Sequence, residues 1–116
     1  MKIEYEDSYL LALLQSVKTI AVVGASQNPE KDSYKVMKFL IDSGYDVSPV
    51  NPNVDNSILG KKCFKNLNEI DKQIDMVDVF RSSKFAFNVA EEAINVDAKI
   101  LWMQLGVVNE LSLIHI

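Results

Sequence analysis

Short apolar runs alternate with segments of helical periodicity along this chain, and this alternation constrains its fold most strongly. The first run, Ile20 to Val23, is continuous, small and β-branched, and it is too short to be a helix. Such a run is typical of a strand covered on both faces. The same signals predict strands at 46–50, 76–80 and 100–105. Helices are expected over 6–18, from Asp32 or Ser33 to a terminator at Gly44, and over 82–96.

Strands that alternate with helices are joined by right-handed crossovers and run parallel. The sequence therefore predicts an α/β protein with a doubly wound, mostly parallel sheet in three α/β/α layers. Residues 53–73 are expected to add a loop, a short edge strand around Cys63 and Phe64, and a brief helix near 67–70.

The composition fits one globular domain in the cytoplasm. Hydrophobic residues make up 48% of the 116 residues and charged residues 24%, so disorder is not expected. No apolar run approaches the roughly 20 residues that span a bilayer, and the first residues lack the apolar stretch of a signal peptide. We therefore expect no membrane partner.

Charge and cysteine content exclude two further classes. One cysteine and one histidine can form neither an internal disulfide nor a Cys/His zinc site. The net charge of −4 gives no general field that would attract nucleic acid. An anionic ligand would have to be held by local groups.

In a doubly wound sheet, ligands bind beyond the carboxyl ends of the strands, where the strand order reverses. Four segments are expected to meet there, namely 24–29, 51–53, 80–83 and 104–107.

The first of these segments has the chemistry of a phosphate site. Gly24 permits a tight turn, and the amides of the turn and of the following helix would face an anion. Ser26 and Ser33 add hydroxyls, and Lys31 or Lys35 could supply positive charge. The alternative is a plain strand-to-helix connection that is capped for stability.

The segment does not match the pattern of ordinary NAD sites. The spacing G-x-G-x-x-G is absent, because positions 26 and 29 are Ser and Pro. The second strand ends in "PVNP", without the acid that would accept hydrogen bonds from ribose hydroxyls. This is compatible with a phosphorylated ribose, as in NADP or coenzyme A, although no arginine lies on the loop.

Three residues in or after the later strands have a structural and a ligand-binding interpretation: Arg81, Asp78, which could also touch the ligand, and Trp102, which could also be a stacking platform. Arg81 could clamp a phosphate or order the wall of the cleft by pairing with an acid. Asp78 lies inside an apolar strand, where a buried carboxylate needs a partner, and we interpret it as part of the core. Trp102 is interpreted as core packing.

Seven blocks in order carry a resemblance to a known family: "VGAS-N-P", "SYKV", "GYDVSPVNP", "ILGKK", "IDMVDVFR", "EEAI" and "AKILWMQLGVVNE". Over residues 16–110 the chain resembles the small standalone CoA-binding domain proteins, which are similar to the nucleotide-binding domain of the succinyl-CoA synthetase α subunit. The resemblance implies a Rossmann-like fold that binds coenzyme A or acyl-CoA. It also implies that the pyrophosphate lies at residues 24–28 and at the helix that begins at Ser33.

The candidate binding residues combine both lines of reasoning. They are Gly24, Ala25, Ser26, Asn28, Pro29, Ser33, Tyr34, Lys35, Asn51, Pro52, Phe80, Arg81, Met103, Gln104 and Gly106.

Departures from the family argue against ligase activity. Asn53 and Val54 stand where the ligase subunits carry a lysine, and the lone histidine, His115, cannot serve as their phosphorylated relay. Cys63 is expected away from the cleft, so no catalytic residue is proposed. The chain is interpreted as a non-catalytic or regulatory binding module. The alternatives are an NAD(P)-dependent oxidoreductase or nucleotide sensor on the same fold, and a protein-interaction module with a vestigial cleft.

The last residues depart from the family pattern as well. We expect a domain over 1–110 and an atypical tail over 111–116, which would be a truncation or a non-native scar. The tail is too short for a crossover and a strand, so the family's last helix and strand would be missing. Strand 100–105 would then have a bare edge, through which the protein could self-associate.

Overall fold

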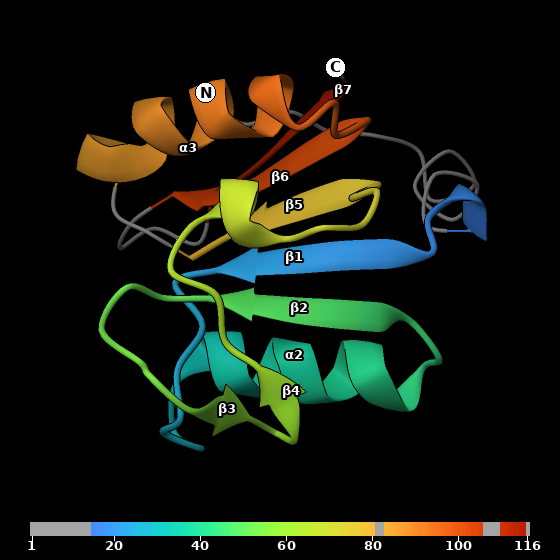
Figure 1. Cartoon of the computed structure of the whole chain (residues 1–116). Helices are drawn as coiled ribbons and strands as arrows, with labels where there is room; N and C mark the ends of the chain where they lie inside the picture. The colour runs from blue at the N-terminus through green and yellow to red at the C-terminus, as the bar shows by residue number, and fades with distance from the viewer. Residues whose placement is uncertain (1–14, 81–82, 106–109, 116) are drawn as a thin grey trace.

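The computed structural model describes residues 15–80, 83–105 and 110–115, which form an α/β fold around a five-stranded sheet (Figure 1). The sheet has the order β2-β1-β5-β6-β7. Its strands are β1 (Thr19–Val23), β2 (Asp46–Val50), β5 (Met76–Val79), β6 (Ile100–Leu105) and β7 (Glu110–His115). The other elements are the helices α2 (Asp32–Asp42) and α3 (Ser83–Asn95), the strands β3 (Ser57–Ile58) and β4 (Lys61–Lys62), and the 3₁₀ helix η1 (Leu67–Glu69).

The parallel part of the sheet is the predicted Rossmann-like arrangement. β1, β2, β5 and β6 all run parallel, and α2 and α3 form two of the crossovers. The chain passes from β1 outward to β2 and then returns to β5 on the other side of β1. The strand order therefore reverses between β1 and β5, where ligands bind in folds of this class.

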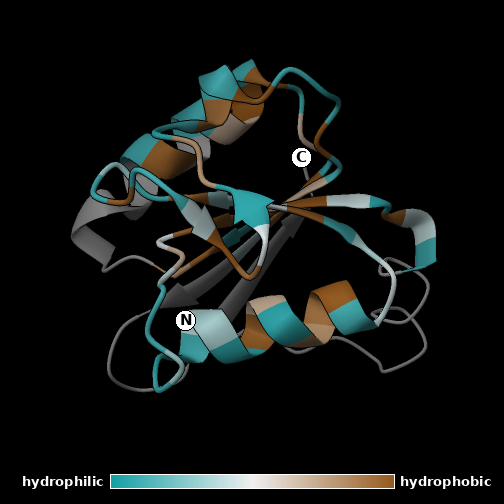
Figure 2. Ribbon diagram, turned by 60° about the horizontal axis from the view of Figure 1, so that its bottom comes forward, coloured by the Kyte–Doolittle hydropathy of each residue, from teal (hydrophilic) through white to brown (hydrophobic). Residues whose placement is uncertain are grey.

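Both faces of β1 are buried, as its continuous apolar sequence predicts. Ile20 and Val22 share a buried cluster with residues of α2, whereas Ala21 and Val23 share one with residues of α3. Figure 2 shows the two helices on opposite sides of the sheet. The expected three layers are thus present.

Helix α2 ends where Gly44 was predicted to terminate it. Gly44 has φ +97°, a left-handed conformation that costs glycine little. Its N–H donates to the carbonyl of Ile41, and the next N–H, of Tyr45, donates to the carbonyl of Leu40. This pair of bonds is a Schellman motif, which satisfies carbonyls that the helix end would leave without donors.

The start of α2 differs from the prediction. The N-cap is Lys31, while Asp32 and Ser33, the predicted caps, lie inside the first turn. Within the described chain, no side chain caps this end of the helix. The reason is that the turn over residues 28–31 leads directly into the helix, so the helix begins one position earlier than a cap at Asp32 would require.

Helix α3 lies close to its predicted range. Val89 and Ala93 are buried against the sheet and Val96 is half-buried, as the helical spacing predicted. The helix begins at Ser83, and the preceding residues 81–82 lie outside the described residues.

Between β2 and β5 the chain forms a small hairpin, β3–β4. The two turn residues, Leu59 and Gly60, both have positive φ, +51° and +77°, as a type I′ turn requires. The predicted edge strand lay slightly too late in the sequence, because β4 ends at Lys62 and Phe64 makes only a single bridge to Val50. The predicted short helix near 67–70 is η1.

The expectation of a bare edge on strand 100–105 is wrong. β7 pairs antiparallel with β6 over six residue pairs, from Ile100 with His115 to Leu105 with Glu110. The expectation assumed a parallel strand, which needs a crossover of a dozen residues or more, whereas an antiparallel neighbour needs only a short connection. The predicted self-association through the edge of β6 therefore loses its basis.

Asp75 joins three strands at the amino-terminal edge of the sheet. Its Oδ2 accepts hydrogen bonds from the backbone N–H groups of Lys18, at 2.9 Å, and Thr19, at 3.3 Å. Its own N–H donates to the Thr19 hydroxyl, and Lys99 lies 3.8 Å from Oδ1. Burial raises the pKa of the Asp75 carboxyl, but the backbone donors, Lys99 and Thr19 outweigh it, and the pKa is lowered.

Replacing Asp75 with Ala should lower the free energy of unfolding by about 2 kcal/mol, because two backbone N–H groups lose their acceptor. Urea denaturation of Asp75→Ala and of the exposed control Asp71→Ala would measure the difference. Because the folded pKa is lowered, the difference should narrow as the pH falls below the ordinary value of 3.8. Equal stability of the two variants at neutral pH would contradict this role.

Candidate functional site

The carboxyl ends of the parallel strands bring most of the predicted site residues to one edge of the sheet. The segment from Gly24 follows β1, Asn51 follows β2, Phe80 follows β5, and Met103 and Gln104 lie near the end of β6. The predicted residues Arg81 and Gly106 lie outside the described residues. The described candidates therefore come from four neighbouring strand ends.

The turn after β1 is fixed by the end of β2. Gly24 has φ +85°, which strongly favours glycine. Its N–H and that of Ala25 both donate to the carbonyl of Val50, at 2.9 and 3.3 Å. The expectation that these two amides face a phosphate is therefore wrong, because they hold the turn against the neighbouring strand.

The next residues form a chain of local hydrogen bonds. The N–H of Asn28 donates to the Ser26 hydroxyl, and the N–H of Glu30 donates to the side-chain oxygen of Asn28, both at 3.0 Å. The N–H of Lys31 donates to the Asn28 carbonyl. Asn28 and Ser26 thus shape the loop that leads into α2, and Pro29 lies exposed on it.

The first turn of α2 keeps its donors available. In the described part of the chain, the N–H groups of Asp32 and Ser33 have no acceptor, whereas those of Tyr34 and Lys35 donate to the Lys31 carbonyl. Free N–H groups and the positive end of the helix dipole together attract anions. Among the predicted residues, Ser33 is buried, Tyr34 is half-buried and Lys35 is exposed.

Asn51 connects the loop after β2 to the turn after β1. Its Nδ2 donates to the carbonyl of Ala25 at 2.8 Å, and its side-chain oxygen accepts from the N–H of Asn53. Pro52 is exposed beside it. The amide side chain, predicted as a ligand contact, therefore positions both loops.

Cys63 lies closer to this site than predicted. Its buried thiol donates weakly to the carbonyl of Asn51, with 3.7 Å between sulfur and oxygen. Burial raises the pKa of the Cys63 thiol, so little of the nucleophilic thiolate is present.

Lys65 is a residue that the sequence reasoning missed. Its ammonium group donates to the carbonyls of Pro52 and Val54, at 3.1 and 3.5 Å, and forms an ion pair with Asp55. The hydrogen bond from Lys65 lowers the pKa of the exposed Asp55 carboxyl. The β3–β4 hairpin brings Lys65 back to the loop after β2, and the turn signal at Leu59-Gly60 could have indicated this return.

Asp78 is the one strongly perturbed carboxyl among the described residues. It lies in β5 with 7% of its surface exposed, and burial raises its pKa to about 7. Its neighbours in the sheet are Val22 of β1 and Trp102 of β6. The interpretation as a buried residue is confirmed, but within the described chain it has no hydrogen bond or ion pair to compensate its burial.

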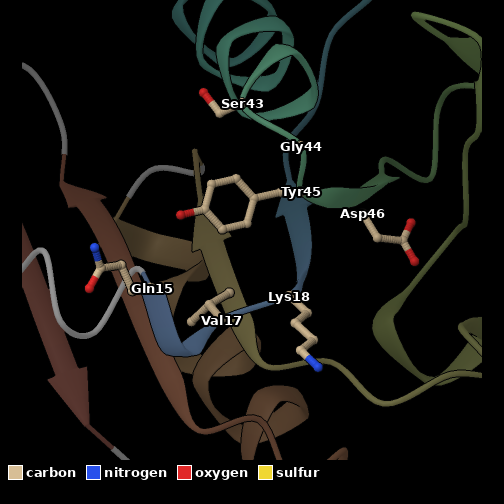
Figure 3. A pocket seen from close by; sticks show the side chains of 7 residues that line it. All are labelled: Gln15, Val17, Lys18, Ser43, Gly44, Tyr45 and Asp46. Atoms are coloured by element: carbon tan, nitrogen blue, oxygen red, sulfur yellow. The ribbon is translucent and has the colours of Figure 1, made fainter.

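A pocket of about 460 Å³ lies at the opposite edge of the sheet (Figure 3). It is lined by Gln15, Val17, Lys18, Ser43, Gly44, Tyr45 and Asp46. These residues precede β1 or connect α2 to β2, so the pocket is at the amino-terminal ends of the strands. It is separate from the predicted nucleotide edge.

Two further features are not found among the described residues. They hold no group of three or more His, Cys, Asp or Glu side chains that could bind a metal ion. No helix within them has the length and apolar character to cross a bilayer.

A family model described as "CoA binding domain" matches residues 18–113, which is most of the chain. The chain belongs to the CoA-binding domain family. The resemblance found in the seven sequence blocks is thereby confirmed, and the match includes the turn after β1 and the loop after β2.

Relatives of this CoA-binding domain include standalone proteins and parts of large ligases. The uncharacterized protein YneT of Bacillus subtilis (strain 168) is 48% identical over 98 residues, which cover 84% of this chain and 72% of YneT. The α subunit of acetate–CoA ligase (ADP-forming) I from Pyrococcus furiosus is 38% identical over 87 residues, 71% of this chain but only 19% of that subunit. A hypothetical protein from Pyrococcus horikoshii OT3 has a solved structure with a TM-score of 0.85 and 39% identity, covering 95% of this chain and 75% of that one.

The buried Asp78 makes the stability of the domain depend on pH. The unfolded chain ionises this carboxyl above the ordinary value of 3.8, and the folded chain only near 7. The free energy of unfolding therefore falls as the pH rises from 3.8 to about 7, and above about 7 this loss of stability stays constant. Asp78→Asn should be more stable than the wild type by about 2–4 kcal/mol at about pH 8, with little difference at about pH 4.

Urea denaturation at both pH values would measure this effect, with Asp71→Asn as the exposed control. A stability difference that does not change with pH would contradict the assignment.

Proposed function

We propose that this domain binds coenzyme A or an acyl-CoA and that it acts as a non-catalytic, regulatory module. One observation carries the proposal, namely the uncapped start of α2 at the ligand edge. There the amides of Asp32 and Ser33 remain available while the preceding turn is fixed by Val50 and Asn51.

The donors at this edge suit a diphosphate. The first-turn amides and the helix dipole would hold the anion, and the exposed Lys31 and Lys35 would add positive charge that the acidic chain lacks overall. Lys65 also lies at the loop after β2, where its ammonium group holds the carbonyls of Pro52 and Val54 and pairs with Asp55. Its proposed role is therefore to order this loop.

The remaining predicted residues would line the path of the ligand. We propose that Gly24, Ala25, Asn51 and Pro52 form the backbone surface beside the nucleotide. Phe80, Arg81, Met103, Gln104 and Gly106 would line the path of the pantetheine arm, which would lie across the ends of β5 and β6.

The chemistry of the chain favours binding over catalysis. Cys63 is buried with a raised pKa, which disfavours the thiolate that nucleophilic attack requires. The one histidine, His115, lies in β7, which pairs only with β6 among the described strands.

Calorimetric titration with CoA, 3′-dephospho-CoA, NADH and NADPH would test the proposal. CoA should bind more tightly than its dephospho form and than both nicotinamide nucleotides. The reason is that β2 ends without an acidic residue, so no carboxylate there would repel a phosphate on the ribose. Tighter binding of NADPH than of CoA would favour the oxidoreductase or sensor alternative. Absence of binding by all four ligands would favour an interaction module.

A proline at position 32 would test the amide donor directly. Pro is tolerated at the first helical position, and Lys31 before it has φ −79° and ψ 143°, as a residue before Pro requires. Asp32→Pro and Asp32→Ala both remove the acid, but only the proline removes the N–H. The proline variant should therefore bind CoA roughly tenfold more weakly than the alanine variant.

Circular dichroism would check that α2 is intact in both variants. Equal affinities of the two for CoA would place the diphosphate elsewhere.

A further inference from the structure

The position of Asp78 gives it access to the ligand edge. β5 lies between β1 and β6, as Figure 1 shows, and Asp78 is two residues before Phe80, where the strand has ended. Phe80 is fixed to the end of β1, because its N–H donates to the carbonyl of Val23 at 2.7 Å. Asp78 therefore lies just below the point where the strand order reverses.

The Asp78 carboxyl has no internal partner that would explain its burial. Within the described chain no hydrogen bond or ion pair is found for it, although buried polar groups are nearly always satisfied. Every side-chain oxygen of the described residues either contacts solvent or makes a hydrogen bond. The Asp78 oxygens therefore retain contact with solvent, and a ligand atom could reach them.

The surroundings of Asp78 favour the protonated carboxyl. Its register neighbours on the same face, Val22 and Trp102, carry no charge, and neither do Ile20, Met76 and Ile100 of the cluster on that face. The titratable side chains in or against this cluster are the half-buried Tyr34 of α2, Tyr45 after α2 and the buried Cys63. The charged residues of α2, which are Asp32, Lys35, Lys38 and Asp42, are all exposed. A protonated carboxyl is a hydrogen-bond donor, whereas a carboxylate can only accept.

We propose that protonated Asp78 donates a hydrogen bond to a carbonyl oxygen of the pantetheine arm when coenzyme A is bound. This inference rests on the proposed function. The inference extends the proposed function by assigning a specific polar contact to the pantetheine arm, the part of the ligand that carries no charge.

Two physical arguments favour this contact. The diphosphate would lie at the end of β1 and the arm would cross the ends of β5 and β6, so the arm would pass β5 next to the diphosphate. The arm contains two amides whose carbonyl oxygens need a donor when they leave water. A neutral acid can supply that donor without the repulsion that a carboxylate would exert on the nearby phosphates.

The experiment compares two ligands and three proteins. CoA contains the pantetheine arm, and 3′-phosphoadenosine 5′-diphosphate contains the same nucleotide and diphosphate without it. The proteins are the wild type, Asp78→Asn, which keeps a donor of similar shape, and Asp78→Leu, which has none. Asp71→Asn serves as the remote control, and thermal unfolding confirms that each variant is folded.

Asp78→Leu should bind CoA about tenfold more weakly than the wild type, the effect expected for one buried hydrogen bond, and bind the arm-free nucleotide equally well. Asp78→Asn should bind CoA within about threefold of the wild type, because its amide can still donate. For the wild type, the ratio of CoA affinity to nucleotide affinity should fall as the pH rises from about 6 to about 8. The terminal phosphate of the arm-free nucleotide loses a proton in the same range, so Asp78→Asn gives the baseline for the change of this ratio with pH, and the wild-type ratio should fall more than this baseline.

Three results would overturn the inference. One is unchanged CoA binding by Asp78→Leu. Another is an equal loss of affinity for both ligands in Asp78→Leu, which would indicate a structural role. The third is a wild-type affinity ratio with the same pH dependence as that of Asp78→Asn. If the wild type binds neither ligand at any pH, the proposed function itself fails. The two failures are therefore distinguishable.

Discussion

The carbonyl of Val50 is the contact on which the ligand edge depends. It accepts hydrogen bonds from the N–H groups of both Gly24 and Ala25, so the turn after the central strand is fixed by the end of its neighbour. Asn51 adds a bond to the Ala25 carbonyl. Because the turn obtains its rigidity from β2, the amides that remain available for an anion are those at the start of α2.

Two carboxyl groups near opposite edges of the parallel sheet, those of Asp75 and Asp78, have different surroundings. At the amino-terminal edge, Asp75 satisfies the backbone N–H groups of Lys18 and Thr19 and lies beside Lys99, so its charge is compensated within the protein. Three residues later, within β5, the Asp78 side chain has no such partner in the described chain, and burial raises its pKa. One carboxyl is therefore compensated within the protein, and the other is the group on which the proposed contact with the pantetheine arm depends.

The loop after β2 shows how a binding surface can be organised from distant sequence. Lys65 donates to the carbonyls of Pro52 and Val54, so a residue that follows the hairpin orders a loop that precedes it. Cys63 lies under the same loop, against the carbonyl of Asn51. This edge is the one where we propose that the ligand binds, whereas the 460 Å³ pocket lies at the amino-terminal edge of the sheet.

The parallel sheet, its two covering helices and the end of α2 could be predicted from the amino-acid sequence, because apolar periodicity and a glycine at position 44 act locally. The strand ends that meet could also be predicted, since parallel strands share one carboxyl edge. The folded structure was needed to show that Gly24 and Ala25 bond to Val50, that Lys65 reaches Pro52, and that β7 returns antiparallel on β6. These features depend on which backbone groups of distant segments face one another, and side-chain pattern along one segment carries no information about that pairing.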